Sequence, residues 1–164
     1  MSVTLKGSCR CGAVHFSCES HTPQPYQRCY CSICRKTDGG GGYAINLGAY
    51  AKTLKVKGKQ HIKVYRAKMR EEGKKTTTST GQRNFCGKCG SCLWLFDPEW
   101  PDLIHPFASV IDTDLPKAPE HVNMMLDFKA NWADLPKGKG DKHVKRYPKE
   151  SLEDWHRRHG LLST

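Results

Sequence analysis

Cysteines supply most of the chemistry that this 164-residue chain could perform, and eight of its nine cysteines fall into three groups. The groups are Cys9-x-Cys11, Cys29-x-Cys31-x-x-Cys34 and Cys86-x-x-Cys89-x-x-Cys92, while Cys18 stands apart. Cysteines one or two residues apart are typical of tight turns that present two sulfur atoms to one metal ion. Because the chain starts without a secretory signal, we expect a cytoplasmic, reducing location, where clustered cysteines indicate metal ligands sooner than disulfides.

The first and third groups can be combined into one four-cysteine site. Cys9 and Cys11 form one pair, Cys86 and Cys89 form the other, and glycines follow both pairs. A structural zinc ion needs four tetrahedral ligands, and a zinc ion held by these thiolates would join the N-terminus to the middle of the chain. We therefore expect a closed, structural zinc site here.

The middle group differs because Cys29, Cys31 and Cys34 supply three thiolates within six residues and no neighbouring residue supplies a fourth. A catalytic zinc ion keeps one position open for water or substrate. The spacing equally permits Cys92 or a histidine to close the position, which would make a second structural site. Two zinc ions per chain are predicted in either case, although the spacing does not exclude an iron–sulfur cluster.

Charge is concentrated in one segment of a basic chain whose formal net charge is +11. Residues 51–75 hold ten Lys and Arg against Glu71 and Glu72. A stripe of this kind can bind phosphates or an acidic ligand, but lysines also protect the edge strands of sheets from aggregation. Only Tyr65 could stack on a base in this segment, so we do not expect nucleic acid as a partner.

The elements that must position these residues are short strands between turn signals. Candidate strands cover residues 4–8, 13–18, 43–47, 54–56, 62–66, 93–96, 103–110 and 122–128. Residues 32–37 could form one helical turn, residues 74–82 an edge strand or a mobile loop, and residues 131–142 an irregular surface segment.

One helix is well signalled near the C-terminus, with Ser151 as its N-cap and Gly160 as its stop. No apolar stretch is long enough to cross a membrane. The sequence thus predicts a mainly β protein of irregular antiparallel sheets with a C-terminal helix. We expect a zinc-binding domain over 1–130 and an extension over 131–164 whose short helix packs on the same domain.

Three blocks of sequence resemble the glutathione-dependent formaldehyde-activating enzyme family, which includes centromere protein V. They are GSCRCGAVHF (7–16), CYCSICRKTDGGG (29–41) and FCGKCGSCLW (85–94). The resemblance implies a β-tent fold of coiled antiparallel sheets. It also implies that Cys9, Cys11, Cys86 and Cys89 bind the structural zinc and that Cys29, Cys31 and Cys34 bind the catalytic zinc. Cys92 stands where relatives commonly have a small polar residue, so it is assigned to neither site.

The charge of a three-thiolate site favours a sulfur substrate. Three thiolates on one Zn²⁺ give a net −1 centre, which suits a substrate thiol better than it suits the generation of hydroxide. The reaction implied by the family joins glutathione and formaldehyde into S-hydroxymethylglutathione. We therefore predict a carbon–sulfur lyase-type enzyme that forms or cleaves adducts of a small thiol, such as glutathione, with an aldehyde or related electrophile.

Cationic groups near the site would bind the carboxylates of glutathione. Arg10, Arg28, Arg35 and Lys36 flank the cysteine groups and are the candidates, although each could equally be a surface charge. The alternative function is a non-catalytic, zinc-stabilised binding module like centromere protein V that uses the basic stripe. An open fourth position at Cys29, Cys31 and Cys34 favours the enzyme, and a closed one favours the module.

Overall fold

The computed structural model describes residues 1–163, and most of its regular elements are short strands. The strands are β1 (Val3–Ser8), β2 (His15–Ser20), β3 (Gln27–Cys29), β4 (Ala44–Ile45), β5 (Ala49–Tyr50), β6 (Lys55–Lys57), β7 (Ile62–Tyr65), β8 (Lys68–Met69), β9 (Thr77–Thr78), β10 (Gln82–Cys86), β11 (Cys92–Phe96), β12 (Leu103–Pro106), β13 (Val122–Met124) and β14 (Lys142–His143). The α-helices are α1 (Ser32–Thr37) and α2 (Leu152–Arg158). Short 3₁₀ turns are η1 (Ala51–Thr53), η2 (Lys59–His61), η3 (Ala108–Val110) and η4 (Leu126–Phe128).

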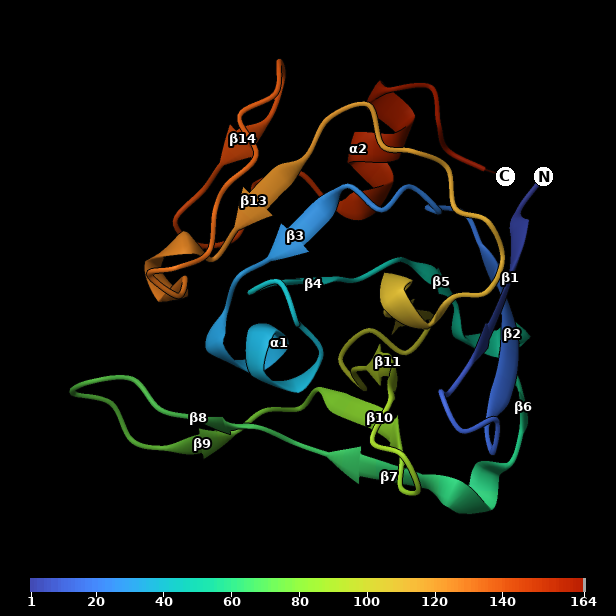
Figure 1. The fold of residues 1–164 in the computed structure, drawn as a ribbon. Helices are drawn as coiled ribbons and strands as arrows, with labels where there is room; N and C mark the ends of the chain where they lie inside the picture. Colours follow the sequence, from blue (N-terminus) through green and yellow to red (C-terminus); the bar gives the residue numbers. More distant parts are fainter. Residues whose placement is uncertain (164) are drawn as a thin grey trace.

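The strands form three small sheets and a hairpin (Figure 1). One sheet has the order β1-β2-β6, the second β5-β12-β11-β10-β7 and the third β14-β13-β3-β4, while β8 and β9 form the hairpin. Every pairing is antiparallel except those of β13 with β3 and with β14. The prediction of a mainly β protein with several antiparallel sheets and a C-terminal helix is confirmed.

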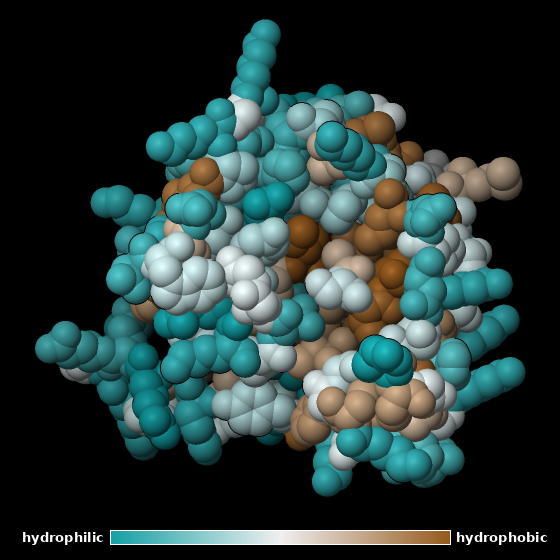
Figure 2. Space-filling view, viewed as in Figure 1, coloured by the Kyte–Doolittle hydropathy of each residue, from teal (hydrophilic) through white to brown (hydrophobic). Residues whose placement is uncertain are grey.

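The main core lies between the first two sheets. Leu5 and Phe16 from the first sheet pack with Leu93, Trp94 and Ile104 from the second. The rings of Phe16 and Trp94 meet edge to face with centroids 5.1 Å apart. Figure 2, viewed from the same side as Figure 1, shows hydrophilic residues over most of the surface and hydrophobic residues gathered in the middle of the face.

Several strands are shorter than the sequence predicted. The strand expected over 103–110 ends at Pro106, and the strand expected over 122–128 ends at Met124. Met125 then takes the left-handed conformation, with φ 60°, which turns the chain into η4. A non-glycine residue in this conformation is strained and is held only where the surrounding structure requires it. The segment 74–82 contains the short edge strand β9 and the first residue of β10.

The C-terminal helix α2 packs on the residue that precedes β3. The Ser151 hydroxyl caps α2 by accepting a hydrogen bond from the Asp154 backbone N–H at 3.0 Å. Trp155 of α2 is fully buried and stacks on Tyr26 at 3.7 Å between ring centroids. The boundary at residue 130 stays a prediction. Within residues 1–163, no helix combines the length and the apolar character needed to cross a membrane.

Candidate metal centres and the adjoining cavity

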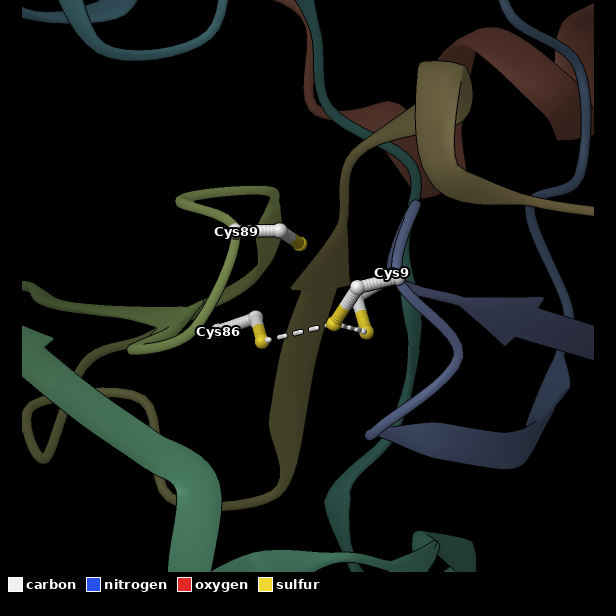
Figure 3. Close-up of side chains that lie close together, drawn as sticks. Cys9, Cys86 and Cys89 are labelled. Carbon is white, nitrogen blue, oxygen red and sulfur yellow. Dashed lines mark hydrogen bonds between the residues drawn. The ribbon is translucent and has the colours of Figure 1, made fainter.

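The first and third cysteine groups meet in space as predicted. The Sγ atoms of Cys9, Cys11, Cys86 and Cys89 all lie within 4.8 Å of one another. Figure 3 shows Cys86, at the end of β10, and Cys89, in the turn between β10 and β11, facing Cys9 from the turn after β1. The Sγ atoms are 3.6 Å apart for Cys9 and Cys11 and 3.8 Å apart for Cys11 and Cys86. Tetrahedral zinc with bonds of roughly 2.3 Å places its sulfur ligands roughly 3.8 Å apart, so the cluster fits this ion.

Polar contacts around the four-cysteine cluster favour thiolates. The Val14 backbone N–H donates to Cys9 Sγ at 3.2 Å, and the Ser91 hydroxyl lies 3.2 Å from Cys89 Sγ. Hydrogen bonds from the hydroxyl and backbone of Ser91 lower the pKa of Cys89 to about 5. Four protein sulfurs fill a tetrahedral ion's coordination, so a metal here would have no position for a substrate.

The middle group forms a second cluster, which we call the tripod. The Sγ atoms of Cys29, Cys31 and Cys34 lie within 4.8 Å of one another. Cys29 ends β3, and Cys31 is the N-cap of α1, where its Sγ accepts a hydrogen bond from the Cys34 N–H at 3.3 Å. Hydrogen bonds from the thiols of Cys29 and Cys34, and from backbone N–H groups of α1, lower the pKa of Cys31 to about 2.

The tripod has a free fourth corner in the part of the chain that the structure describes. No further His, Cys, Asp or Glu joins its three sulfur atoms. Cys92, which the spacing allowed as a fourth ligand, donates its S–H to the Thr37 carbonyl at 2.8 Å and lies outside the cluster. Cys18 is buried in the main core, and burial raises the pKa of its thiol to about 12.

A buried arginine lies behind the tripod. Arg83 of β10 is only 8% exposed, and its Nη2 donates to Cys34 Sγ at 3.4 Å while Nη1 donates to Thr37 Oγ1 at 3.4 Å. Over residues 1–163 it forms no salt bridge with a carboxylate. A buried cation is costly without a negative partner, and three thiolates on a divalent ion supply a net charge of −1 beside it. The tripod and Arg83 together therefore fit a bound zinc ion.

Asp38, at the C-cap of α1, adds a second charge behind the tripod. Burial raises the pKa of Asp38 to about 7, and negative charge on the neighbouring Cys34 sulfur acts in the same direction, although Arg83 opposes the shift. Its Oδ2 is buried without a hydrogen-bond partner. The carboxyl group is thus poised between its neutral and charged forms near neutral pH.

A cavity of about 420 Å³ opens beside Cys31. The hairpin β8–β9, which extends below α1 in Figure 1, forms one wall, and Met125, Phe128, Arg146 and Tyr147 form the other. Its cationic lining residues are Lys68, Arg70, Lys74, Lys75 and Arg146. These hairpin residues are the end of the basic stripe, for which the sequence allowed either a solvated strand edge or a binding surface. The end of the stripe therefore lies next to the tripod.

The four cations proposed from the sequence lie elsewhere. Arg10 lines a different cavity together with Asp38 and Cys92, and Arg28 stacks over the Tyr43 ring at 4.6 Å. Arg35 Nε donates to the Phe128 carbonyl at 3.3 Å, and Lys36 is exposed in the last turn of α1. Contacts of these four residues with a substrate stay a prediction.

Sequence reasoning missed Arg83 and Tyr147, and it did not place the hairpin cations of the basic stripe beside the tripod. Arg83 stands three residues before Cys86, and a charged residue in a strand beside a cysteine pair was the signal available. Tyr147 gave no such signal, and the charge of the basic stripe did not reveal its position, because only the folded chain brings these residues to Cys31.

The chain also matches a known protein family over most of its length. The profile of the family described as glutathione-dependent formaldehyde-activating enzyme matches residues 4–125, a span that contains all nine cysteines. The chain belongs to this family.

One member of this formaldehyde-activating enzyme family is similar over nearly the whole chain, and a solved structure is similar over about two thirds of it. A Halomonas elongata protein, provisionally named glutathione-dependent formaldehyde-activating enzyme, is 53% identical over 157 residues, which covers 96% of this chain and 97% of the relative. The crystal structure of a Rhodobacter sphaeroides protein is similar with a TM-score of 0.52 and 26% identity. That match covers 68% of this chain and 91% of the solved one.

Proposed function

We propose that this family member adds a small, carboxylate-bearing thiol to an aldehyde, and cleaves the same carbon–sulfur bond in reverse. The tripod of Cys29, Cys31 and Cys34 would be the thiol-binding centre, and a structural zinc ion would occupy the four-cysteine cluster. The observation that carries the proposal is a three-sulfur cluster with a free corner beside a cationic cavity. Glutathione and formaldehyde, the pair in the names of the family and of the Halomonas elongata relative, are the first substrates to test.

Zinc at the tripod would supply a Lewis acid that holds an entering thiol as its thiolate, the nucleophilic form. The residues of the chain would set up the rest of the reaction. Cys31 is the only tripod cysteine that lines the cavity, so the thiol would approach from that side. Arg83 would balance the negative charge of the tripod from the buried side.

The cations of the cavity support a substrate with carboxylates. Lys74 is paired with Glu71 at 2.9 Å and Arg146 with Asp127 at 2.9 Å. Lys68, Arg70 and Lys75 form no salt bridge within the part of the chain that the structure describes, and Lys68 donates only to the Thr78 hydroxyl at 2.9 Å, so these charges are available to a ligand. Glutathione carries two carboxylates, and these unpaired cations on one wall supply the opposite charge.

Tyr147 is the group that we assign to proton transfer. It is the one phenol that lines the cavity with Cys31. Tyr147 is 73% exposed overall, but partial loss of hydration at its phenol and negative charge on the tripod sulfurs both raise its pKa, so it keeps its proton at neutral pH. When the sulfur–carbon bond forms, the carbonyl oxygen needs a proton, and Tyr147 would donate it; in the cleavage direction Tyr147 would take the proton back.

Cobalt substitution tests the proposal directly. The purified protein should hold two zinc ions, and the cobalt-substituted protein should change its charge-transfer bands when glutathione is added, with tighter binding as pH rises towards the thiol pKa. Magnetisation-exchange NMR should then show faster interconversion of formaldehyde, glutathione and their adduct. One bound ion, iron in place of zinc, or cobalt bands that millimolar glutathione does not move would overturn the proposal and favour a binding module. The cytoplasmic location and the absence of a nucleic-acid partner stay predictions.

A further inference from the structure

A second cavity, of about 480 Å³, lies between the N-terminal end of α2 and residues of β12 and β13. Tyr147 lines both cavities. Met124, in the wall of the second cavity, lies opposite Cys29 in the register of β13 and β3 and packs on it. The two cavities therefore share Tyr147, and the second has in its wall the residue that pairs with a tripod cysteine.

The lining of the second cavity is apolar where that of the first is cationic. Trp100, Leu103, Met124 and Leu152 contribute hydrophobic surface. No Lys or Arg is among the described residues that line it, and burial lowers the pKa of His21 and His105, so both imidazoles are neutral.

The charged groups at the second cavity offer an anionic occupant no unpaired cation. Glu150 and Glu153 line it, and each carboxylate is paired with an arginine of α2, Arg158 and Arg157 respectively. A thiol with two carboxylates therefore fits the cationic cavity, which leaves the apolar cavity for the other reactant.

We propose that the second cavity binds the carbon chain of the carbonyl substrate, and that this enzyme acts on aldehydes with an apolar chain of several carbons. The inference rests on the proposed function. Formaldehyde has no carbon chain and would leave the cavity without an apolar occupant. The reaction is RSH + R′CHO ⇌ RS–CH(OH)R′: the sulfur–carbon bond forms, and the thiol proton is replaced by a proton on the former carbonyl oxygen. The R′ group lies in the apolar cavity.

A series of unbranched aldehydes from acetaldehyde to hexanal tests the proposal. Carbonyl reactivity changes little along this series, so a rise in kcat/KM reports burial of the chain. A fully buried methylene is worth roughly fourfold in binding, and we expect kcat/KM to rise by about two- to fourfold per methylene until the cavity is filled. A flat or falling series would overturn the proposal.

Two tryptophans provide a test variant and a matched control, because both side chains are exposed to a similar degree. Trp100 is 64% exposed and lines the cavity, whereas Trp132 is 62% exposed and does not. Trp100→Ala should flatten the dependence on chain length, and Trp132→Ala should retain it, with melting temperatures close to that of the wild type for both. A slope that Trp100→Ala leaves intact would also overturn the proposal.

Failure of the apolar-chain proposal can be told apart from failure of the thiol–aldehyde function. Turnover of formaldehyde and acetaldehyde with no gain from longer chains would overturn only the apolar-chain proposal and leave the thiol–aldehyde function standing. No turnover of any aldehyde, together with cobalt bands that glutathione does not move, would overturn both.

Discussion

The two cysteine clusters differ in how far apart their ligands lie along the chain and in what surrounds them. The four-cysteine cluster joins the turn after β1 to the turn after β10, and Cys11 and Cys86 are 75 residues apart. The tripod takes all its sulfurs from residues 29–34 and has Arg83 behind it and a cationic cavity in front. A cluster that links distant segments suits stability, whereas a local cluster with a free corner suits binding and chemistry.

One strand connects the two clusters. β10 carries Arg83, which contacts the tripod, and Cys86, which belongs to the four-cysteine cluster. The four-cysteine cluster therefore also fixes the strand that supplies the buried cation of the tripod. Substitutions at each cluster, and at the residues around the tripod, test how far this division of labour holds.

Cys31→Ser should have the largest effect on activity. It removes the tripod sulfur that faces the cavity, and we expect thiol–aldehyde turnover to fall by at least about 100-fold, because outer-shell changes alone typically cost 10–100-fold. Metal analysis should find one zinc ion left, and the melting temperature should change little. Turnover near the wild-type rate would show that the chemistry lies elsewhere.

Cys86→Ser should have the largest effect on stability. The cross-link that it breaks closes a loop of roughly 75 residues, against about six for the tripod, and the loop-closure estimate makes the loss about 2 kcal/mol greater than for Cys31→Ser. In a domain of this size the difference corresponds to roughly 4–8 °C in melting temperature. Urea and thermal unfolding of both variants measure it, and equal losses would contradict the assignment of one structural and one catalytic cluster.

Arg83→Met should weaken metal binding at the tripod without weakening it at the four-cysteine cluster. The variant removes the hydrogen bond to Cys34 and the nearby positive charge, and we expect about 10–100-fold lower cobalt affinity at the tripod. Competition with a chelator measures this, and Arg83→Lys should recover part of the loss because it restores the charge. Lys57→Met, at an exposed position of β6, is the control. Equal losses of cobalt affinity at the tripod and at the four-cysteine cluster would mean that Arg83 stabilises the fold and has no specific effect on the tripod.

The double variant Arg70→Ala/Lys75→Ala should raise the KM for glutathione by about 3–10-fold and reduce its dependence on salt, because exposed charges contribute modest, screened energies. Lys36→Ala, outside the cavity, should have no such effect. If Lys36→Ala raises the KM for glutathione and the double variant does not, the carboxylates of glutathione are bound by the cations that flank the cysteine groups in the sequence and not by those of the hairpin.

Asp38→Asn should have the smallest effect, and it should depend on pH. Because the folded protein raises the pKa of Asp38 to about 7, the native state binds more protons than the unfolded state between about pH 4 and 7. Stability from this group therefore falls as pH rises through that window. Near pH 5 the neutral Asp and Asn should be alike, and at pH 8 the Asn variant should be more stable by at least about 1 kcal/mol. Urea midpoints at both pH values test this, and a difference that does not change with pH would contradict it.

The sequence by itself determined the features that depend on short spacings. The members of each cysteine pair and of the tripod lie close together because a turn of a few residues is enough to bring them together. α2 was predictable for the same reason, because the Ser151 side chain caps the helix through a hydrogen bond with Asp154, only three positions further along the chain. The mainly β class followed from the alternation of short apolar segments and turns.

Only the tertiary structure decided what surrounds the tripod. Arg83 and Cys86 are both buried although they lie three residues apart on β10, across a register shift between Asn84 and Phe85. A regular two-residue alternation does not predict that pattern. The hairpin cations and Tyr147 reach the tripod from segments more than 30 residues away along the chain, and Tyr147 also borders the apolar cavity. Which distant side chains share a cavity depends on how the sheets pack, and no local spacing encodes it.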